Sequence, residues 1–328
     1  MRTRRGLIGW IAGGAVLLIA VVFGGIAAVN ITVYSPAGTV QAYFDDLARG
    51  DAASALARPG VAPSGLRDAQ RVLLDGAAFT GPTKVSVHTD KQSGSHATVT
   101  ATYDIAEKTY THTFTLTKTA TPVFDEWRFD ESPLASLTVS VQHGIEFQVG
   151  RLGAVDISAY PGGDAGLFQA TATFPAFSGV SYRVFRDRPL ITAPAVTVAV
   201  TEPGEVVEAT IVVEPTKKFV SSVQQGIDDA LNKCLTQKVL MPTDCPFGFT
   251  TTNRFLGDAT WTMPTYPELT LTPGNESWLV TGQGTAHVTG QIQSLYDGTV
   301  TDVSEDAPFG ISMRAWALDN GTRVDIRP

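Results

Sequence analysis

The chain has 328 residues, and 43% of them are hydrophobic, so it can bury real cores and form two or three domains. Its formal net charge is −8, and no run rich in Lys or Arg follows the first five residues. An acidic chain repels the phosphate backbone, so we exclude nucleic acid as a partner.

The N-terminal sequence predicts a membrane anchor. Residues 7–29 contain no charge and would span about 34 Å as a helix, enough for a hydrocarbon core of roughly 30 Å. The tail, residues 1–6, holds three Arg, and such a tail stays in the cytoplasm. We therefore expect a single-pass protein of the cell membrane, with a cytoplasmic N-terminus and an extracytoplasmic C-terminus. A cleaved signal peptide is the alternative, because Gly25-Ile26-Ala27 offers a small-x-small cleavage site.

Three helical pieces are predicted after the anchor. Ser35-Pro36 is a good helix start, because Ser caps the end and Pro suits the first turn. Gly50 ends this helix, and Asp51 can cap a second, short one. A third piece is expected at Leu66–Leu74.

Stretches of alternating apolar and polar residues follow these helices. Alternation with a period of two predicts strands, and we expect at least four of them in a meandering antiparallel sheet. These strands are expected near residues 84–89, 99–105, 110–116 and 127–129. The helices and strands together predict an α+β domain over residues 35–133, with the sheet curled over the first helix.

The first helix also carries a likeness to a known family. Residues 35–51 read SPAGTVQAYFDDLARGD and contain the pattern Y-F-x-x-L-x-x-G-D. This run resembles the opening helix of NTF2-like (cystatin-like) domains in membrane-anchored actinobacterial envelope proteins. The resemblance implies a cystatin-like fold for this domain. It implies no catalytic residues, because that superfamily includes enzymes, binding proteins and inert modules.

Residues 134–215 predict a small all-β sandwich. At least five strands are expected, with no helical pattern between them. Gln142-His143-Gly144 stands between two apolar stretches and indicates a hairpin turn. The segment 174–182 resembles a strand–turn–strand of the β-domain in TcaA-like cell-wall stress proteins, which implies a similar ectodomain organisation.

Residues 216–328 predict a second α+β domain, with one disulfide. Thr216 can cap a helix that runs to about Val239, and several strands follow it. The two cysteines of the chain, Cys234 and Cys245, can form one bridge or none. Both stand in the part expected outside the membrane, where disulfides persist, so we predict the bridge.

The sequence contains no motif typical of catalysis, of cofactor binding or of a metal site. Neighbouring carboxylates such as Asp45-Asp46 point about 100° apart on a helix, so we assign them to solvated faces. His287 is expected on the polar side of its strand. We therefore predict no catalytic residue, no cofactor and no metal.

One set of residues could line a ligand pocket in the first domain: Tyr103, Tyr110, His112, Phe114 and Trp127. They lie on the predicted strands and would face the interior of a cystatin-like fold. An apolar pocket with one polar group holds a ligand by burial. His112 could also act as a base, or it could complete the sheet face with one hydrogen bond.

The leading hypothesis is a membrane-anchored, extracytoplasmic binding or scaffolding protein of the cell envelope, without enzymatic activity. Its partner would be a cell-wall precursor, a glycan or another envelope protein. The alternatives are an enzyme of the cystatin-like superfamily that acts on an envelope metabolite, and a structural subunit of a membrane complex. A polar cavity beside His112 would favour the enzyme, and an exposed apolar patch would favour the partner protein.

Overall fold

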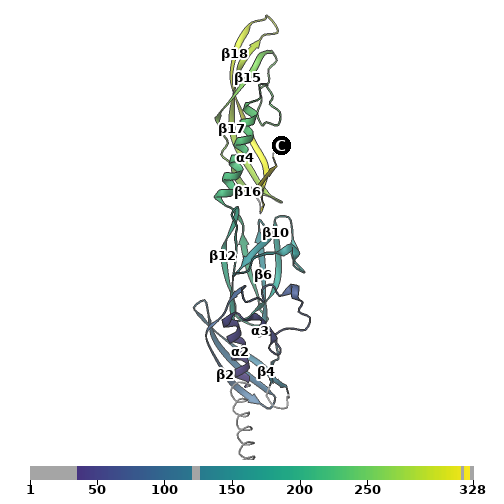
Figure 1. The fold of residues 1–328 in the computed structure, drawn as a ribbon, viewed down its shortest axis with the longest axis vertical. Coiled ribbons are helices and arrows are strands. Elements are labelled where there is room, and N and C mark those ends of the chain that lie inside the picture. The colour runs from purple at the N-terminus through teal and green to yellow at the C-terminus, as the bar shows by residue number, and fades with distance from the viewer. Residues whose placement is uncertain (1–34, 120–125, 319–320, 326–328) are drawn as a thin grey trace, which may run out of the picture.

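The computed structural model describes residues 35–119, 126–318 and 321–325. Over these ranges the chain is elongated, and three units follow one another along its long axis (Figure 1). The predicted tail, residues 1–6, and the predicted membrane segment, residues 7–29, lie outside the described residues. No helix within the described ranges is long and apolar enough to cross a membrane.

The predicted fold class is wrong. We expected a transmembrane helix and two α+β domains on either side of an all-β one, but the described residues are 52% strand and 16% helical. The described part of the protein is therefore mostly β. It contains three α-helices, and none of them can span a membrane. One expected helix, Leu66–Leu74, contains only the short 3-10 turn η1 (Asp68–Gln70). The alternating Thr- and Val-rich runs instead extend into strands of up to 19 residues, because branched side chains suit a pleated sheet.

The first unit begins with the two helices that the caps predict. In α2 (Pro36–Arg49), the Ser35 hydroxyl accepts a backbone N–H of the first turn. Gly50 ends this helix in the left-handed conformation, with a φ of 70°. The Asp51 side chain then caps α3 (Ala52–Ala57). These helix boundaries are confirmed.

The apolar face of α2 packs on a sheet in the order β2-β3-β4-β5. Val40, Tyr43, Phe44 and Leu47 form this face, as expected from their spacing, and all four are fully buried. The strands are β2 (Thr83–Ser93), β3 (His96–Ile105), β4 (Lys108–Thr119) and β5 (Glu126–Phe129).

One carboxylate of α2 is buried, contrary to the expected solvated face. The Asp46 side chain is only 2% exposed. It accepts hydrogen bonds from Arg49, at 2.6 Å, and from Arg58, also at 2.6 Å. Arg58 follows α3, so folding α3 back against α2 encloses Asp46 between the two helices. The two arginine side chains supply the charge that a buried carboxylate needs.

The second unit consists of two facing sheets. One has the order β14-β12-β11-β7-β8, and the other has the order β13-β6-β10-β9. The rings of Phe147 and Phe174, one from each sheet, meet at 5.5 Å in the core. The elements are β6 (Leu134–Gln142), β7 (Glu146–Val149), β8 (Ala154–Asp156), η2 (Ile157–Ala159), β9 (Asp164–Ala165), β10 (Gln169–Phe177), β11 (Val180–Asp187), β12 (Ile191–Val200), β13 (Val206–Val212) and β14 (Glu214–Pro215).

The segment Gln142-His143-Gly144 is not a hairpin turn. β6 pairs with β10 and β13, whereas β7 pairs with β8 and β11 in the other sheet. The segment therefore carries the chain from one layer to the other. His143 has a φ of 60°, and this left-handed conformation redirects the backbone out of the sheet that contains β6.

The first and second units share one hydrophobic core. β1 (Phe79–Thr80), which follows the helices of the first unit, pairs with β11 of the second. The hydroxyls of Tyr43, Tyr103 and Tyr182 each donate to a backbone carbonyl of the other unit, at 2.6–3.3 Å. The acceptors are Ser178, Thr201 and Leu73, respectively.

The third unit has a core of its own, between α4 (Lys217–Leu235) and one sheet. Thr216 caps α4 as predicted, but the helix ends at Leu235 rather than near Val239. The sheet has the order β15-β17-β18-β19, with β16 also paired to β17. Its strands are β15 (Arg254–Thr265), β16 (Thr270–Pro273), β17 (Trp278–Gln293), β18 (Val300–Leu318) and β19 (Gly321–Asp325).

Candidate functional site

The predicted pocket residues lie on β3, β4 and β5. Tyr103, Phe114 and Trp127 are buried, and Tyr110 and His112 are half-buried. Trp127 pairs in register with the far end of β4 from Tyr110, about eight residues away, which corresponds to roughly 26 Å along the strand. The five residues therefore do not surround one point.

The interior beside these residues is filled with aromatic rings. The Phe44 ring lies 4.6 Å from that of Tyr103 and 5.9 Å from that of Phe114. His112 stands against the edge of Phe114, at 4.7 Å. Burial lowers the pKa of His112, although the negative charges of Glu202 and Glu131 oppose this effect. The geometry gives these side chains a packing role, and the pocket stays a prediction.

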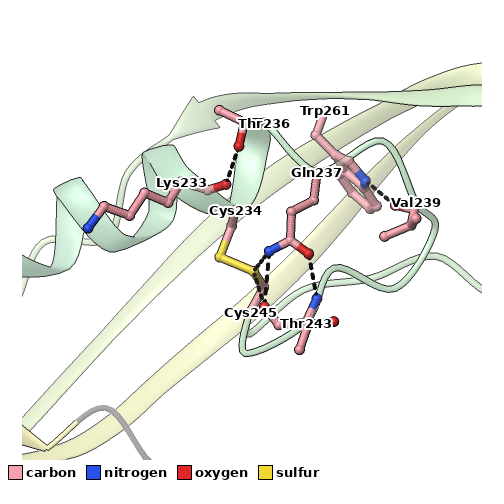
Figure 2. The surroundings of a disulfide bond; sticks show 8 residues. All are labelled: Lys233, Cys234, Thr236, Gln237, Val239, Thr243, Cys245 and Trp261. Carbon is pink, nitrogen blue, oxygen red and sulfur yellow. Dashed lines mark hydrogen bonds between the residues drawn. A yellow bond between two sulfur atoms is a disulfide. The ribbon is translucent and has the colours of Figure 1, made fainter.

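The predicted disulfide between Cys234 and Cys245 is present (Figure 2). It ties the last turn of α4 to the loop that follows, across a sequence separation of 11. The Gln237 side chain holds the same loop, because it donates to the carbonyl of Thr243 at 3.0 Å and accepts from its N–H at 2.8 Å. The loop between the two cysteines is thus fixed by one covalent bond and two hydrogen bonds.

Two adjoining hollows lie on the second unit, and the larger of them also borders the third unit. Their volumes are about 280 Å³ and 450 Å³, and both are lined by Gln142, Gly166 and Gln169. We call them together the junction groove. The groove is lined by residues 140–143, 164, 166–171, 210 and 273–275.

Four separate segments meet in the junction groove, one of them represented by Thr210 of β13 alone. Gln142 and His143 stand where the chain leaves β6 for the other sheet, and Leu167 lies in the loop between β9 and β10. Asn275 comes from the loop between β16 and β17 of the third unit. Figure 1 shows β16 next to the upper ends of β10 and β12. The groove therefore depends on how the two units abut.

An aromatic cluster forms the floor of this junction. The ring of His143 stacks on Phe168 at 5.8 Å. Both rings also make T-shaped contacts with the ring of Trp278, His143 at 5.8 Å and Phe168 at 5.4 Å. The Nδ1 atom of His143 lies 3.1 Å from the carbonyl oxygen of Val213, which can only accept, so Nδ1 carries the proton. These contacts join the two units through packing.

The lining of the groove is polar but nearly uncharged. Gln142 and Gln169 are opposite each other on β6 and β10, and both are exposed. Their side-chain amides make no hydrogen bond with any described residue. Asp164 is the one charged side chain among the lining residues. Such a surface can exchange hydrogen bonds with hydroxyl and amide groups and offers little to a strongly charged ligand.

A second cluster, which we did not anticipate, lies on the outer face of the third unit. His287 Nδ1 is 2.6 Å from Asp306 Oδ1, and His287 Nε2 is 3.1 Å from Ser304 Oγ. This is the connectivity of a Ser-His-Asp triad. However, Ser304 stands within a long strand, whose backbone N–H groups lie in the plane of the sheet rather than toward the side chain. Catalysis by such a serine needs donors aimed at the oxyanion, so we assign no catalytic role here.

Alternation along β18 puts Ser304 and Asp306 on one face, which the sequence indicates. The register of β17 against β18, which brings His287 opposite Asp306, comes only from the structure.

No protein-family model and no curated protein matches this sequence. The resemblance to cystatin-like domains and to TcaA-like ectodomains therefore stays a prediction.

Proposed function

We propose that this chain is a non-enzymatic, extracytoplasmic protein of the cell envelope that binds a glycan in the junction groove. The ligand class follows from the lining. Hydroxyl and acetamide groups of a sugar chain match the amides of Gln142, Gln169 and Asn275, and the near absence of charge disfavours polyanions. A cell-wall glycan or its precursor has this chemistry.

The observation that carries the proposal is the pair of amides on β6 and β10. Gln142 and Gln169 face each other across the strands with their side chains exposed and unengaged among the described residues. Each amide offers a donor and an acceptor together, which is the pairing that a sugar hydroxyl requires. The adjacent Leu167 is 72% exposed and could cover the apolar face of a sugar ring.

The test measures binding of a defined probe, the hexamer of N-acetylglucosamine, to the full chain in detergent micelles by calorimetry. Gln142→Ala together with Gln169→Ala should weaken binding about tenfold, because each lost hydrogen bond contributes about 0.5–1.5 kcal/mol. The matched control is Gln92→Ala, at the exposed end of β2, which should bind as the unaltered chain does. No binding of the hexamer, or equal binding by the double variant and the control, would reject the proposal.

The extracytoplasmic location has separate support. The charge-free segment 7–29 follows a basic tail, and the Cys234–Cys245 bridge is a bond that persists in oxidising compartments. We infer that the described part of the chain is outside the cell membrane and held there by this segment. A reporter that is active only in the cytoplasm should be silent when it is fused after Pro328. Reporter activity there would reject the extracytoplasmic location, and the result of the glycan-binding test would be unaffected.

A further inference from the structure

The strand β18 has a long open edge. It pairs with β17 from Val300 to Ala315, but with β19 only from Arg314 onward. Within the described part of the third unit, residues 300–310 therefore have no strand on their outer side. At about 3.3 Å per residue this edge is roughly 35 Å long. It belongs to the end of the molecule opposite α2 (Figure 1).

Two observations show which backbone groups point outward from this edge. The N–H of Ser294 donates to the carbonyl of Thr299 at 2.8 Å, so Thr299 faces the partner strand. Backbone groups alternate between the two sides of an antiparallel strand, and the pairing of β17 with β18 has no register shift. Pro308 falls on the outward side, where a proline without an N–H is tolerated. The residues whose N–H and C=O groups point outward include Asp302, Ser304 and Asp306.

The same edge is strongly acidic. The side chains of Asp302 and Asp306 share one face and are held by Gln291, at 2.9 Å, and by His287, at 2.6 Å. Asp306 is nevertheless 70% exposed. Glu305 is exposed on the opposite face, and residues 300–310 contain no Lys or Arg.

We propose that the open edge of β18 binds an extended, basic segment of a partner protein as an added strand. The unpaired backbone groups supply hydrogen bonds, and the carboxylates select the charge of the partner. The residues opposite Asp302 and Asp306 in an added strand are four positions apart, so the segment should carry Lys or Arg at positions i and i+4. A second copy of this edge is excluded, because like charges would face each other. This inference is independent of the glycan proposal.

The turn at the end of the edge supplies an apolar anchor. Leu295 and Tyr296 are 72% and 99% exposed, and Val300, the first residue of β18, is 47% exposed. The turn is well held, because the Ser294 hydroxyl accepts the N–H groups of Tyr296 and Asp297 at 3.2 Å and 3.4 Å. A segment that follows β18 to its beginning reaches this tip, and aromatic side chains are frequent anchors in interfaces.

The experiment uses the full chain in detergent micelles and two synthetic peptides, TKVTVKVT and TEVTVEVT. The first peptide carries Lys at i and i+4, and the second carries Glu at the same positions. Amide hydrogen exchange should slow at Asp302, Ser304 and Asp306 when the Lys peptide is added. The Lys peptide should also bind about tenfold more tightly than the Glu peptide. Its two Lys form opposite-charge pairs with Asp302 and Asp306, whereas the two Glu of the other peptide form like-charge pairs with them.

A pair of charge-reversed variants completes the test. Asp302→Lys with Asp306→Lys should prefer the Glu peptide. The matched control, Asp229→Lys with Glu268→Lys, makes the same change in net charge at exposed positions of the same unit and should keep the original preference. Circular dichroism of both variants checks that they fold. Unchanged exchange at the three outward amides, or the same peptide preference in both variants, would overturn the proposal.

Discussion

His112 illustrates at the scale of one residue how packing changes titration. Burial favours the neutral imidazole, so the pKa of His112 lies below its ordinary value of 6.5, with Glu202 and Glu131 acting in the opposite direction. The unfolded chain then binds the proton more readily than the folded chain between these two pKa values. The free energy of unfolding should therefore fall as the pH is lowered through about 6.5 and rise as the pH is raised.

Replacing His112 with Phe tests this linkage. The ring remains beside Phe114, so stability near neutral pH should change little, while the loss of stability between about pH 7 and pH 5 should become smaller. Urea denaturation at several pH values measures the effect. Tyr110→Phe, on the same strand face, leaves the imidazole of His112 in place and serves as the control. An unchanged pH dependence in the His112→Phe variant would contradict the account.

Single residues differ in how far their neighbours in sequence determine their environment. The cap by Ser35 was predicted correctly, because its hydrogen bond reaches only three residues along the chain. The burial of Asp46 was not, since it depends on Arg58, which arrives through the fold of α3. Asp45, adjacent in sequence, bonds locally to Gln41 instead.

At the scale of elements, the helices and the alternating strands were largely predictable, but their partners were not. The strand β6 pairs with β10 and with β13, and in both cases the partner is far along the chain. The alternation of apolar and polar residues predicts that β6 has an apolar face, but it does not determine which strand pairs with β6. For this reason the sequence predicts a hairpin at Gln142-His143-Gly144, although this segment connects two layers.

The disulfide belongs to this scale, because it joins one helix to one loop. Replacing Cys234 and Cys245 with Ala should lower the free energy of unfolding of the third unit by about 3 kcal/mol, as the closed loop restricts the unfolded chain. Urea dependence of hydrogen exchange in α4 reports this change selectively. Reduction of the unaltered chain should have the same effect, and thiol labelling of the unreduced, unfolded chain should find no free cysteine. An unshifted urea midpoint would contradict the prediction.

At the scale of the whole molecule, the candidate site could not be predicted. The junction groove combines Gln142 at the end of β6 with Leu167 and Asn275 from two loops. These two loops belong to different units and are more than a hundred residues apart in the sequence. None of these residues carries a motif, and a polar loop residue looks the same in the sequence whether it is isolated or part of a groove. The positions of the predicted pocket residues along their strands likewise come only from the pairing, which places Trp127 at the far end of β4 from Tyr110.

The tyrosine hydroxyls that link the first and second units limit how this chain can be divided and recombined. A cut between residues 133 and 134 would remove the acceptors of Tyr103 and Tyr182 and one of the two acceptors of Tyr43, and it would open the core that both units share. The third unit has a hydrophobic cluster of its own, to which the second unit contributes only Leu190 and Phe168. In a domain exchange, residues 35–215 should therefore be kept as one piece. A replacement for the disulfide-bonded unit must supply an apolar side chain in the place of Trp278, which packs against His143 and Phe168.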